Sequence, residues 1–421
     1  GSFFTFAFWI GLGAMALFDT GDRIIKKKKL KQYLIVFTSV LLLLALPVNM
    51  LLANYSTHNR WGNYVASDYA YNLLNSCEEG SILFTNGDND TFPLWYIQEV
   101  ENFRKDVKIV NLSLLNTPWY IKQLKNIEPK IPLLWSDSQI ERIRPIQWKT
   151  QEVKIAGLTT TVKPTYAGQY LRVQDLMIFE LIKIADWEQP IYFAVTVSGS
   201  SRLGLDKYLS MEGQVMRLYP YEVEKIDEDK IYDNFTSNYR FRNLDNPDVY
   251  FNPNIQRLMQ NYRTAVLQAT MEFINDGNTE KAQDLLNTMN EKIPENIIPQ
   301  YHPELSLRTG RLYYQLGDTA EYKRRMDKVL GSKNLDERTL MLIAQEMIYT
   351  LKDYSKAEKI LLPMYQKDPY NNWVAGSLVR VYRERGDYPK ALNILDRWLS
   401  SAPNDIQAQS LKTQIEKLAN E

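Results

Sequence analysis

Ser81-Ile-Leu-Phe-Thr-Asn-Gly-Asp-Asn-Asp-Thr-Phe-Pro-Leu-Trp-Tyr96 is the stretch of the chain that predicts the fold around it. Its apolar residues Ile82 to Phe84 are typical of a buried strand, and the turn Asn86 to Thr91 is dense in carboxylates and small side chains. We expect a helix to follow, capped by Asp90 or Thr91. A strand, an acidic loop and a helix start together place polar groups where α/β folds usually hold ligands.

The tripeptide Asp88-Asn89-Asp90 within this stretch permits two interpretations. Two aspartates separated by one residue have the spacing with which nucleotide-sugar transferases hold a divalent cation, and hard oxygen ligands suit Mg²⁺, Mn²⁺ or Ca²⁺. In the other interpretation Asp88 and Asn89 shape the turn while Asp90 caps the helix. We favour the turn and the cap, because a tripeptide alone is a weak motif.

The composition excludes several classes of site. Lysine plus arginine and aspartate plus glutamate both number 50 in the 421 residues, so charge gives no bias toward nucleic acid. The single cysteine, Cys77, excludes a disulfide scaffold and a cysteine-cluster metal site. The two histidines, His58 and His302, argue against a multi-histidine metal site. The length suits two or three domains that each bury a core.

Two apolar segments begin the chain. Phe3 to Phe18 is slightly short for a membrane span, and we interpret it as the rest of a transmembrane helix that starts upstream. Leu34 to Ala53 is long enough to cross a bilayer, with Pro47 tolerated as a kink. The basic run Lys26 to Lys29 predicts a cytoplasmic loop, so the chain after about residue 54 would lie outside. The alternative is a buried helical hairpin of a soluble protein.

Strand and helix patterns alternate between about residues 56 and 222, which predicts an α/β domain with a small, mostly parallel, Rossmann-like sheet. Residues 223–254 are charged and aromatic, and we interpret them as a linker that folds back onto this domain. The expected strands are 82–84, 107–112, 190–197 and 213–220, with a hairpin at 153–155 and 159–162, and the expected helices are 64–75, 94–103, one from Thr117-Pro118, and 173–184.

The rest of the chain repeats with the 34-residue period of tetratricopeptide repeats. An earlier copy runs through Gly277 to Ala282, and a degenerate one has Tyr322 where a small alanine should be. We therefore predict four helical repeats stacked as an all-α solenoid. The repeated positions are Tyr354, Ala357 and Pro369, which recur as Tyr388, Ala391 and Pro403. The predicted domains are two transmembrane helices with a basic loop, an extracytoplasmic α/β domain, a linker and the solenoid, at residues 1–55, 56–222, 223–254 and 255–421.

Further candidates for ligand binding are charged and aromatic residues near these elements. His58, Arg60 and Asp68 follow the second apolar segment, where they would face lipid headgroups or a lipid-linked donor; the alternative is an interfacial anchor. Trp119 and Tyr120 follow the second strand, where they would stack on a sugar or pack in the core. The full candidate set is Asp88, Asn89, Asp90, Trp95, Trp119, Tyr120, His58, Arg60 and Asp68.

Several long motifs resemble one protein family. They are Gly1-Ser-Phe-Phe-Thr-Phe-Ala-Phe-Trp-Ile-Gly-Leu-Gly13, Asp68-Tyr-Ala-Tyr-Asn-Leu-Leu74, Ile82 to Tyr96, Pro190-Ile-Tyr-Phe-Ala194, Leu203-Gly-Leu-Asp-Lys-Tyr-Leu209 and Glu212 to Pro220. Together they make roughly residues 1 to 220 resemble the large polytopic membrane proteins of Bacteroidota that were long a family of unknown function. That family is related to the animal transmembrane O-mannosyltransferase that modifies plexins, and it is placed among the C-type glycosyltransferases.

The resemblance implies an enzyme of the bacterial inner membrane that transfers a sugar from a polyprenyl-phosphate donor to a protein in the periplasm. In C-type enzymes the catalytic carboxylate lies in the first external loop, between early transmembrane helices that this sequence does not contain. We therefore expect the catalytic residues upstream of this chain, and we expect the fragment alone to be inactive. The implied partners are the membrane, the lipid-linked donor, and a protein or peptide acceptor held by the repeats.

A non-enzymatic function is the alternative. The groove of tetratricopeptide repeats commonly takes an extended peptide or a helix, so the chain would be a membrane-anchored scaffold of an envelope complex. A scaffold would have no need of the acidic and aromatic loop at residues 86–96, which favours the enzyme.

Overall fold

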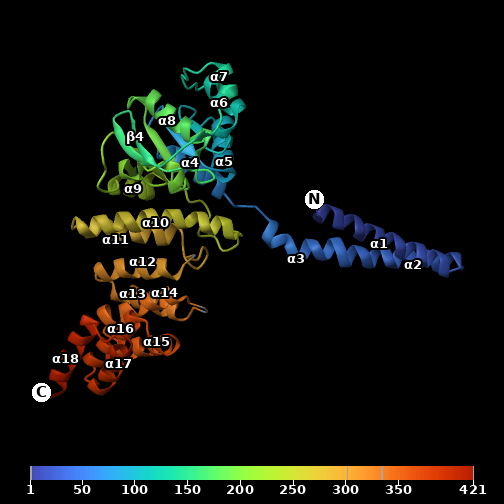
Figure 1. The fold of residues 1–421 in the computed structure, drawn as a ribbon. Coiled ribbons are helices and arrows are strands. Elements are labelled where there is room, and N and C mark those ends of the chain that lie inside the picture. Colours follow the sequence, from blue (N-terminus) through green and yellow to red (C-terminus); the bar gives the residue numbers. More distant parts are fainter. Residues whose placement is uncertain (1, 301, 333–334, 421) are drawn as a thin grey trace. The chain divides into compact units, whose positions relative to one another are not determined.

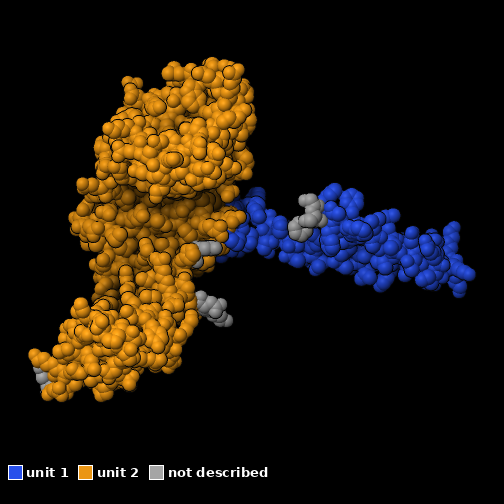
Figure 2. Space-filling view, in the orientation of Figure 1, with its two compact units in different colours: residues 1–64, 246–253 blue, residues 65–245, 254–421 orange. Residues whose placement is uncertain are grey.

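The computed structural model describes residues 2–300, 302–332 and 335–420. The chain divides into two compact units, which Figure 2 colours separately: residues 1–64 with 246–253, and residues 65–245 with 254–421. The first unit holds the two apolar segments, and the second holds the β-sheet and the helical repeats, with the elements labelled in Figure 1.

The first unit contains two long apolar helices. One is α1 (Ser2–Ile24), and the other is a continuous helix made of α2 (Lys28–Leu43), the π-helical turn η1 (Leu44–Val48) and α3 (Asn49–His58). Residues 4–24 and 28–58 are long and apolar enough to cross a membrane, by length and composition. None of the side chains described between residues 4 and 58 is buried, which is unlike the core hairpin of a soluble protein.

Pro47, which the sequence predicts as a kink, lies in the π-helical turn η1. Proline has no N–H to donate, and its ring crowds the carbonyl four residues back; the wider π turn accommodates both. The predicted spans Phe3 to Phe18 and Leu34 to Ala53 are helical, and each lies within a longer helix. That these helices cross a membrane stays a prediction.

A five-stranded sheet forms the centre of the α/β region, in the order β2-β1-β7-β9-β8. The strands are β1 (Ile82–Thr85), β2 (Lys108–Asn111), β7 (Ile191–Ala194), β8 (Leu209–Met211) and β9 (Val215–Leu218). β2, β1 and β7 are parallel, with Phe84 opposite both Val110 and Phe193. Every residue of these three strands is buried, as expected for parallel strands with both faces covered.

The sheet is mixed rather than mostly parallel. β9 pairs antiparallel with both β7 and β8, and β8 was not predicted. β8 and β9 are joined by a short connection with Gly213, which permits only an antiparallel pair, whereas β1, β2 and β7 are joined through helices. The periodicity of the segment 213–220 identifies a strand but carries no information about its direction.

Helices and two small sheets complete the α/β region. α5 begins at Asp88, six residues before the expected helix 94–103, because the acidic turn itself is helical. The predicted cap at Asp90 or Thr91 is therefore wrong: the N-cap is Gly87, and both residues lie in the first turn. The predicted hairpin at 153–155 and 159–162 is confirmed. The helices are α4 (Val65–Asn75), α5 (Asp88–Glu99), α6 (Pro118–Asn126), α7 (Asp137–Arg142) and α8 (Val173–Ala185), and the small sheets pair β3 (Ile146–Gln147) with β6 (Tyr170–Leu171) and β4 (Gln151–Ile155) with β5 (Leu158–Val162).

The charged segment after β9 folds back onto the α/β region. It contains α9 (Glu228–Asp233) and the π-helical turn η5 (Asn234–Asn238), followed by turns and irregular backbone. Phe235 and Leu244 are 2% and 4% exposed, so the segment contributes to the core. Its boundaries as a linker, at residues 223 and 254, stay a prediction.

Helix α4 holds this segment through polar side chains one turn apart. The Asp68 carboxylate accepts hydrogen bonds from the Arg242 backbone N–H (2.7 Å) and from its Nε (2.8 Å). The Asn72 side chain accepts from the Arg240 backbone N–H (2.8 Å) and donates to the Arg240 carbonyl (3.0 Å) and the Tyr262 hydroxyl (2.9 Å). We call these contacts the α4 joint. They connect α4 to the returning segment and, through Tyr262, to α10 (Pro253–Asn275), the first helix of the repeats.

An aromatic cluster surrounds the α4 joint. The Tyr262 ring lies with its centroid 5.6 to 6.1 Å from those of four other rings, mostly edge to face. Edge-to-face contacts between buried rings add to the stability gained from burying their area. The four partners come from α4 and the returning segment, and are Tyr69, Phe235, Tyr239 and Phe241.

The turn between β8 and β9 fits against the same cluster. Gly213 has φ +113°, and a Cβ atom there would collide with the Tyr239 hydroxyl. That hydroxyl instead accepts a hydrogen bond from the Gln214 backbone N–H (3.0 Å). The neighbouring Glu212 carboxylate accepts from Lys230 (2.9 Å) and Tyr219 (2.8 Å), and burial raises the pKa of Glu212.

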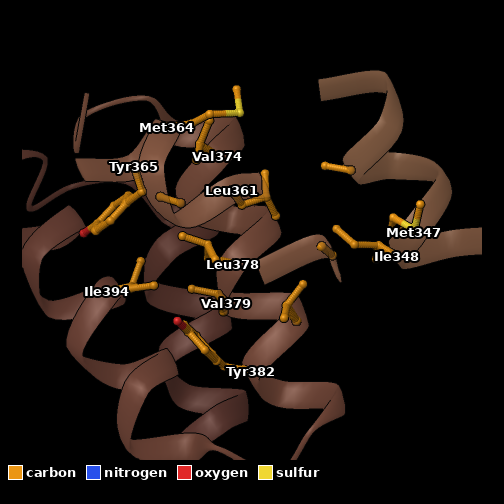
Figure 3. Close-up of a cluster of buried hydrophobic side chains, with 14 of the residues drawn as sticks. Met347, Ile348, Leu361, Met364, Tyr365, Val374, Leu378, Val379, Tyr382 and Ile394 are labelled. Carbon is orange, nitrogen blue, oxygen red and sulfur yellow. The ribbon is translucent and has the colours of Figure 1, made fainter. Parts of the chain in front are cut away.

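The repeats are pairs of helices with a recurrent start. Four second helices begin at an N-cap whose side chain accepts a hydrogen bond from the backbone N–H three residues on: Asn278, Asp318, Asp353 and Asp387. Figure 3 shows the core that adjacent helices bury, including Leu361, Leu378 and Ile394. The helices after α10 are α11 (Thr279–Lys292), α12 (Pro303–Gln315), α13 (Thr319–Leu330), α14 (Glu337–Gln345) with η6 (Glu346–Thr350), α15 (Tyr354–Lys367), α16 (Asn372–Glu384), α17 (Tyr388–Ser401) and α18 (Ile406–Asn420).

The degenerate repeat, α12 with α13, accommodates a large side chain where the other repeats have alanine. Ala357 and Ala391 are fully buried at their repeat positions, but Tyr322 occupies the equivalent position in α13. Gly310 in α12 makes room for the ring, since a Cβ there would lie 3.2 Å from Tyr322 Cδ2. The Tyr322 hydroxyl donates to the buried Glu346 carboxylate of the next repeat (2.5 Å).

Replacing Asn72 by alanine tests the α4 joint. Asn72→Ala leaves the Arg240 backbone groups and the Tyr262 hydroxyl without these buried partners, so we expect the free energy of unfolding to fall by about 3 kcal/mol. Asn75→Ala, the same change at a half-buried position of the same helix, is the control and should cost under about 0.5 kcal/mol. Urea unfolding of the detergent-solubilised protein measures both. Equal losses in the two variants would contradict the role given to Asn72.

The Gly213 turn gives a second stability prediction. Gly213 and Gly80 both have positive φ, but space is open around Gly80. We expect Gly80→Ala to lower the free energy of unfolding by about 1 kcal/mol through backbone strain alone, and Gly213→Ala by more than about 3 kcal/mol, because Tyr239 must also move. Thermal unfolding followed by circular dichroism compares the two. A Gly213→Ala variant as stable as Gly80→Ala would mean that the turn tolerates a side chain.

Candidate site at the carboxyl ends of the parallel strands

The carboxyl ends of β1 and β7 lie at the point where the topology changes direction. From β1 the chain passes through α5 to β2 on one side, and later through α8 to β7 on the other. In open α/β sheets ligands bind outside the carboxyl ends of strands at such a switch point. The loops there begin with Asn86 after β1 and Val195 after β7.

Asp90 lies buried at this point, with 2% of its surface exposed. It stands in the first turn of α5, where an acidic side chain complements the helix dipole. One carboxylate oxygen accepts a hydrogen bond from Thr196 Oγ1 after β7 (2.5 Å), and the other from the Tyr69 hydroxyl of α4 (3.2 Å). Burial raises the pKa of Asp90, while the bonds from Thr196 and Tyr69 act in the opposite direction. Asp90 therefore connects three elements inside the domain.

A second polar network fixes the same edge of the sheet. Thr91 Oγ1 lies 2.9 Å from Thr85 Oγ1 at the end of β1 and accepts from Asn111 Nδ2 at the end of β2 (2.7 Å). Thr91 Oγ1 also donates to the Gly87 carbonyl (2.8 Å). These bonds hold the first turn of α5 against both strand ends, so its exposed residues have a rigid support.

The two aspartates of the Asp88-Asn89-Asp90 tripeptide have different surroundings. Asp88 and Asn89 are exposed at the first two positions of α5, whereas Asp90 is buried. Residues two apart on a helix do not face each other, so the tripeptide does not form a paired carboxylate site. The part of the chain that the structure describes contains no group of three or more His, Cys, Asp or Glu side chains arranged to hold a metal ion.

An aromatic surface covers the neighbouring helices. Phe92, Trp95 and Tyr96 line one side of α5, and Trp119 extends from α6. Phe92, Tyr96 and Trp119 are each more than half exposed, and Trp95 is half-buried. The Phe92 and Trp95 ring centroids are 5.7 Å apart. We call these four residues the aromatic surface.

Tyr120 lies beneath the aromatic surface and joins its two halves. Its ring centroid is 6.5 Å from that of Trp95 and 5.6 Å from that of Trp119. It is 1% exposed, and its hydroxyl accepts from the Asn111 backbone N–H (3.0 Å). Burial raises the pKa of Tyr120 to about 12. Of the predicted pair, Trp119 is therefore the ring available to a ligand, and Tyr120 supports it.

Phe92 and Tyr96 are exposed on this surface but were not among the residues predicted from the sequence. Their spacing from Asp88, four and eight residues, places all three on one face of a helix. This spacing brings Asp88 onto the face only if the helix begins at Asp88, whereas the sequence predicted a cap at Asp90 or Thr91 and a helix over 94–103.

The remaining candidates have structural contacts. Asp68 is 4% exposed and belongs to the α4 joint, where it pairs with Arg242. His58 and Arg60 belong to the first unit, at the end of the second apolar helix. His58 Nδ1 lies 3.0 Å from the Asn54 carbonyl, and Arg60 donates to the Thr57 carbonyl (2.8 Å).

Two family models match parts of the chain. The model described as TMEM260-associated domain 2 matches residues 66–145 and 143–236, which is the α/β region with the segment that folds back onto it. A tetratricopeptide repeat model matches residues 349–415, which contain the last two predicted repeats. The second match agrees with the 34-residue period and with the helix pairs of the structure.

Part of the chain is similar to a protein whose name states an enzymatic activity. The protein O-mannosyl-transferase TMEM260 of Mus musculus is 29% identical over 79 residues, which are 19% of this chain and 11% of the mouse protein. The chain thus matches only a small part of that protein's length. The comparisons relate the α/β region to TMEM260-associated domains and the C-terminal region to tetratricopeptide repeats.

Proposed function

We propose that this chain is the extracytoplasmic portion of a membrane-embedded glycosyltransferase that transfers a sugar from a polyprenyl-phosphate-linked donor to protein. The observation that carries the proposal is the match between the α/β region and the TMEM260-associated domain, supported by the similarity to the mouse O-mannosyltransferase. The repeats would hold the acceptor protein or another partner.

The two apolar helices support a position at a membrane. Their exposed apolar side chains need an apolar environment, and a bilayer provides one. The basic residues 26–29 between them would remain in the cytoplasm, which directs the α/β region and the repeats to the outer side. In a bacterial inner membrane that side is the periplasm.

The aromatic surface is where we propose that the domain contacts a sugar. Flat rings pack against the C–H faces of sugar rings, and Phe92 and Trp119 present such faces to solvent. Asp88 lies one helical turn before Phe92 on the same side of α5, where its exposed carboxylate can accept hydrogen bonds from sugar hydroxyls. This arrangement binds and orients a sugar. We assign the catalytic carboxylate to another segment of the enzyme.

A membrane-anchored scaffold is the second candidate. The tetratricopeptide match favours it, because such repeats commonly bind proteins without chemistry. In a scaffold the aromatic surface would be a protein contact, and its loss would leave protein glycosylation unchanged.

Two substitutions on the aromatic surface distinguish the candidates. Trp119→Ala and Asp88→Asn each remove about 1.4 kcal/mol of sugar contact, so we expect transfer from a labelled polyprenyl-phosphate sugar to protein, in membranes containing the enzyme, to fall about tenfold. Tyr166→Ala, at an equally exposed ring of the same domain, is the control and should transfer normally. Normal transfer by both test variants would make the surface structural, and protein glycosylation that stays unchanged when the complete gene is deleted would favour the scaffold.

A further inference from the structure

We propose that the repeats bind an acidic, extended segment of a partner protein along a face that carries five arginines. The proposal deepens the role given above to the repeats, and it rests on their acting as a protein-binding arm. The arginine face consists of Arg308 and Arg311 on α12, Arg338 on α14, and Arg380 and Arg383 on α16.

These residues form one continuous face across three helices. Arg308 and Arg338, from α12 and α14, both contact the Glu304 carboxylate, at 2.8 and 3.5 Å. Arg311 pairs with Glu346 at the end of α14. The Arg380 guanidinium of α16 lies over the Tyr349 ring of η6, 4.4 Å from its centroid. The helices α12, α14 and α16 are the first helices of successive pairs, so the face runs along the repeats.

Positive charge exceeds negative charge on this face. Arg308 and Arg338 both contact the Glu304 carboxylate, and the Asp336 carboxylate also lies near Arg338. At α16, Arg383 pairs with Glu384, and Arg380 and Lys352 lie close enough to lower the pKa of the same carboxyl. The acidic groups that face the arginines are Glu304, Glu346, Glu384 and the cap residue Asp336.

The guanidinium groups of Arg338 and Arg380 are exposed, so their N–H groups can donate hydrogen bonds to a ligand. The Arg338 side chain is 74% exposed, and its described contact with a carboxylate is the 3.5 Å one to Glu304. Arg380 is exposed and rests on the Tyr349 ring, which orients the flat guanidinium. A guanidinium held in one orientation binds a carboxylate with two parallel hydrogen bonds, which lysine cannot do.

A cavity between α12 and α14 adds an apolar contact. It has a volume of about 150 Å³, and its floor includes Leu307 and the half-buried Leu342, with Arg308, Arg311, Glu304 and Glu346 around them. A partner side chain of leucine size fits there between the arginines. The buried Glu346, held by Arg311 and the Tyr322 hydroxyl, keeps the cavity wall in place.

The two arginines of α13 are paired with carboxylates of the repeats themselves. Arg325 on α13 is 1% exposed and bonds to Glu295, Glu321 (2.8 Å) and Asn290 (3.1 Å). Arg324 forms two bonds of 2.6 Å to Glu321. These charges on α13 serve the packing of α11 against α13, whereas Arg338 and Arg380 on the first helices are exposed in a row with the other arginines of the face.

The geometry also sets the length of the partner segment. Packed helices lie about 10 Å apart, so the distance from α12 to α16 is about 20 Å. An extended chain rises about 3.3 Å per residue and covers this distance in about six residues. Acidic residues at alternate positions would reach successive arginines.

Fluorescence anisotropy with the full chain in detergent tests this inference. The probe is a labelled twelve-residue peptide of alternating glutamate and serine with one central leucine, and a lysine version serves as the opposite-charge probe. We expect the glutamate peptide to bind, the lysine peptide not to bind, and the affinity to fall with salt. The double variant Arg338→Gln with Arg380→Gln should weaken binding at least tenfold.

The control removes the same charge from the second helices. Arg324→Gln with Arg397→Gln changes two exposed arginines on α13 and α17, and it should alter the affinity less than twofold. Equal weakening in both double variants, or no binding of the glutamate peptide by the unchanged chain, overturns the inference. Peptide binding by this chain, together with unchanged protein glycosylation after deletion of the complete gene, would support the arginine face and contradict the enzyme. Glycosylation that depends on the gene, without peptide binding by this chain, would support the enzyme and contradict the arginine face.

Discussion

The hydrogen bonds of Asn72 are the interaction on which the second unit depends. One side chain on α4 bonds to both backbone groups of Arg240 and to the hydroxyl of Tyr262, which is 190 residues away in the sequence. Asp68, one turn earlier, holds Arg242 in the same way. Because Asn72, Asp68 and Tyr262 are buried, their polar groups need partners, and this arrangement of α4, the returning segment and α10 supplies them. The α/β region and the repeats thereby share one core.

The same helix also supports the candidate site. Tyr69, between Asp68 and Asn72, packs on Tyr262 and donates to Asp90, so the acidic turn after β1 is linked to the first helix of the repeats. Thr196 fixes the other oxygen of Asp90 from the loop after β7. The buried carboxylate thus has a structural role that positions the exposed Asp88 and the aromatic surface. Asp90 is buried and stabilises the fold, whereas Asp88 is exposed to solvent. The two carboxylates of the motif therefore have separate roles and do not form a paired cation site.

Local patterns in the sequence predicted the parallel strands, the hairpin and the repeats, because these depend on neighbouring residues. The antiparallel direction of β9 and the burial of Asp90 were not predictable in this way, since both depend on contacts between distant segments. Tyr322 appeared only as a departure from the repeat pattern; the compensating Gly310 and the bond to Glu346 required the structure. The sequence places Trp119 and Tyr120 after the second strand, but only the fold shows which ring is exposed.

The proposed transfer of sugar to protein is tested most directly by measuring which sugars the envelope proteins of living cells carry. Mass spectrometry of peptides from those proteins would compare cells with the gene, cells without it, and cells in which the complete gene is restored. We predict that a set of O-linked glycopeptides disappears on deletion and returns on restoration. The same glycopeptides at the same occupancy in all three would contradict it and leave the repeats as a protein-binding scaffold.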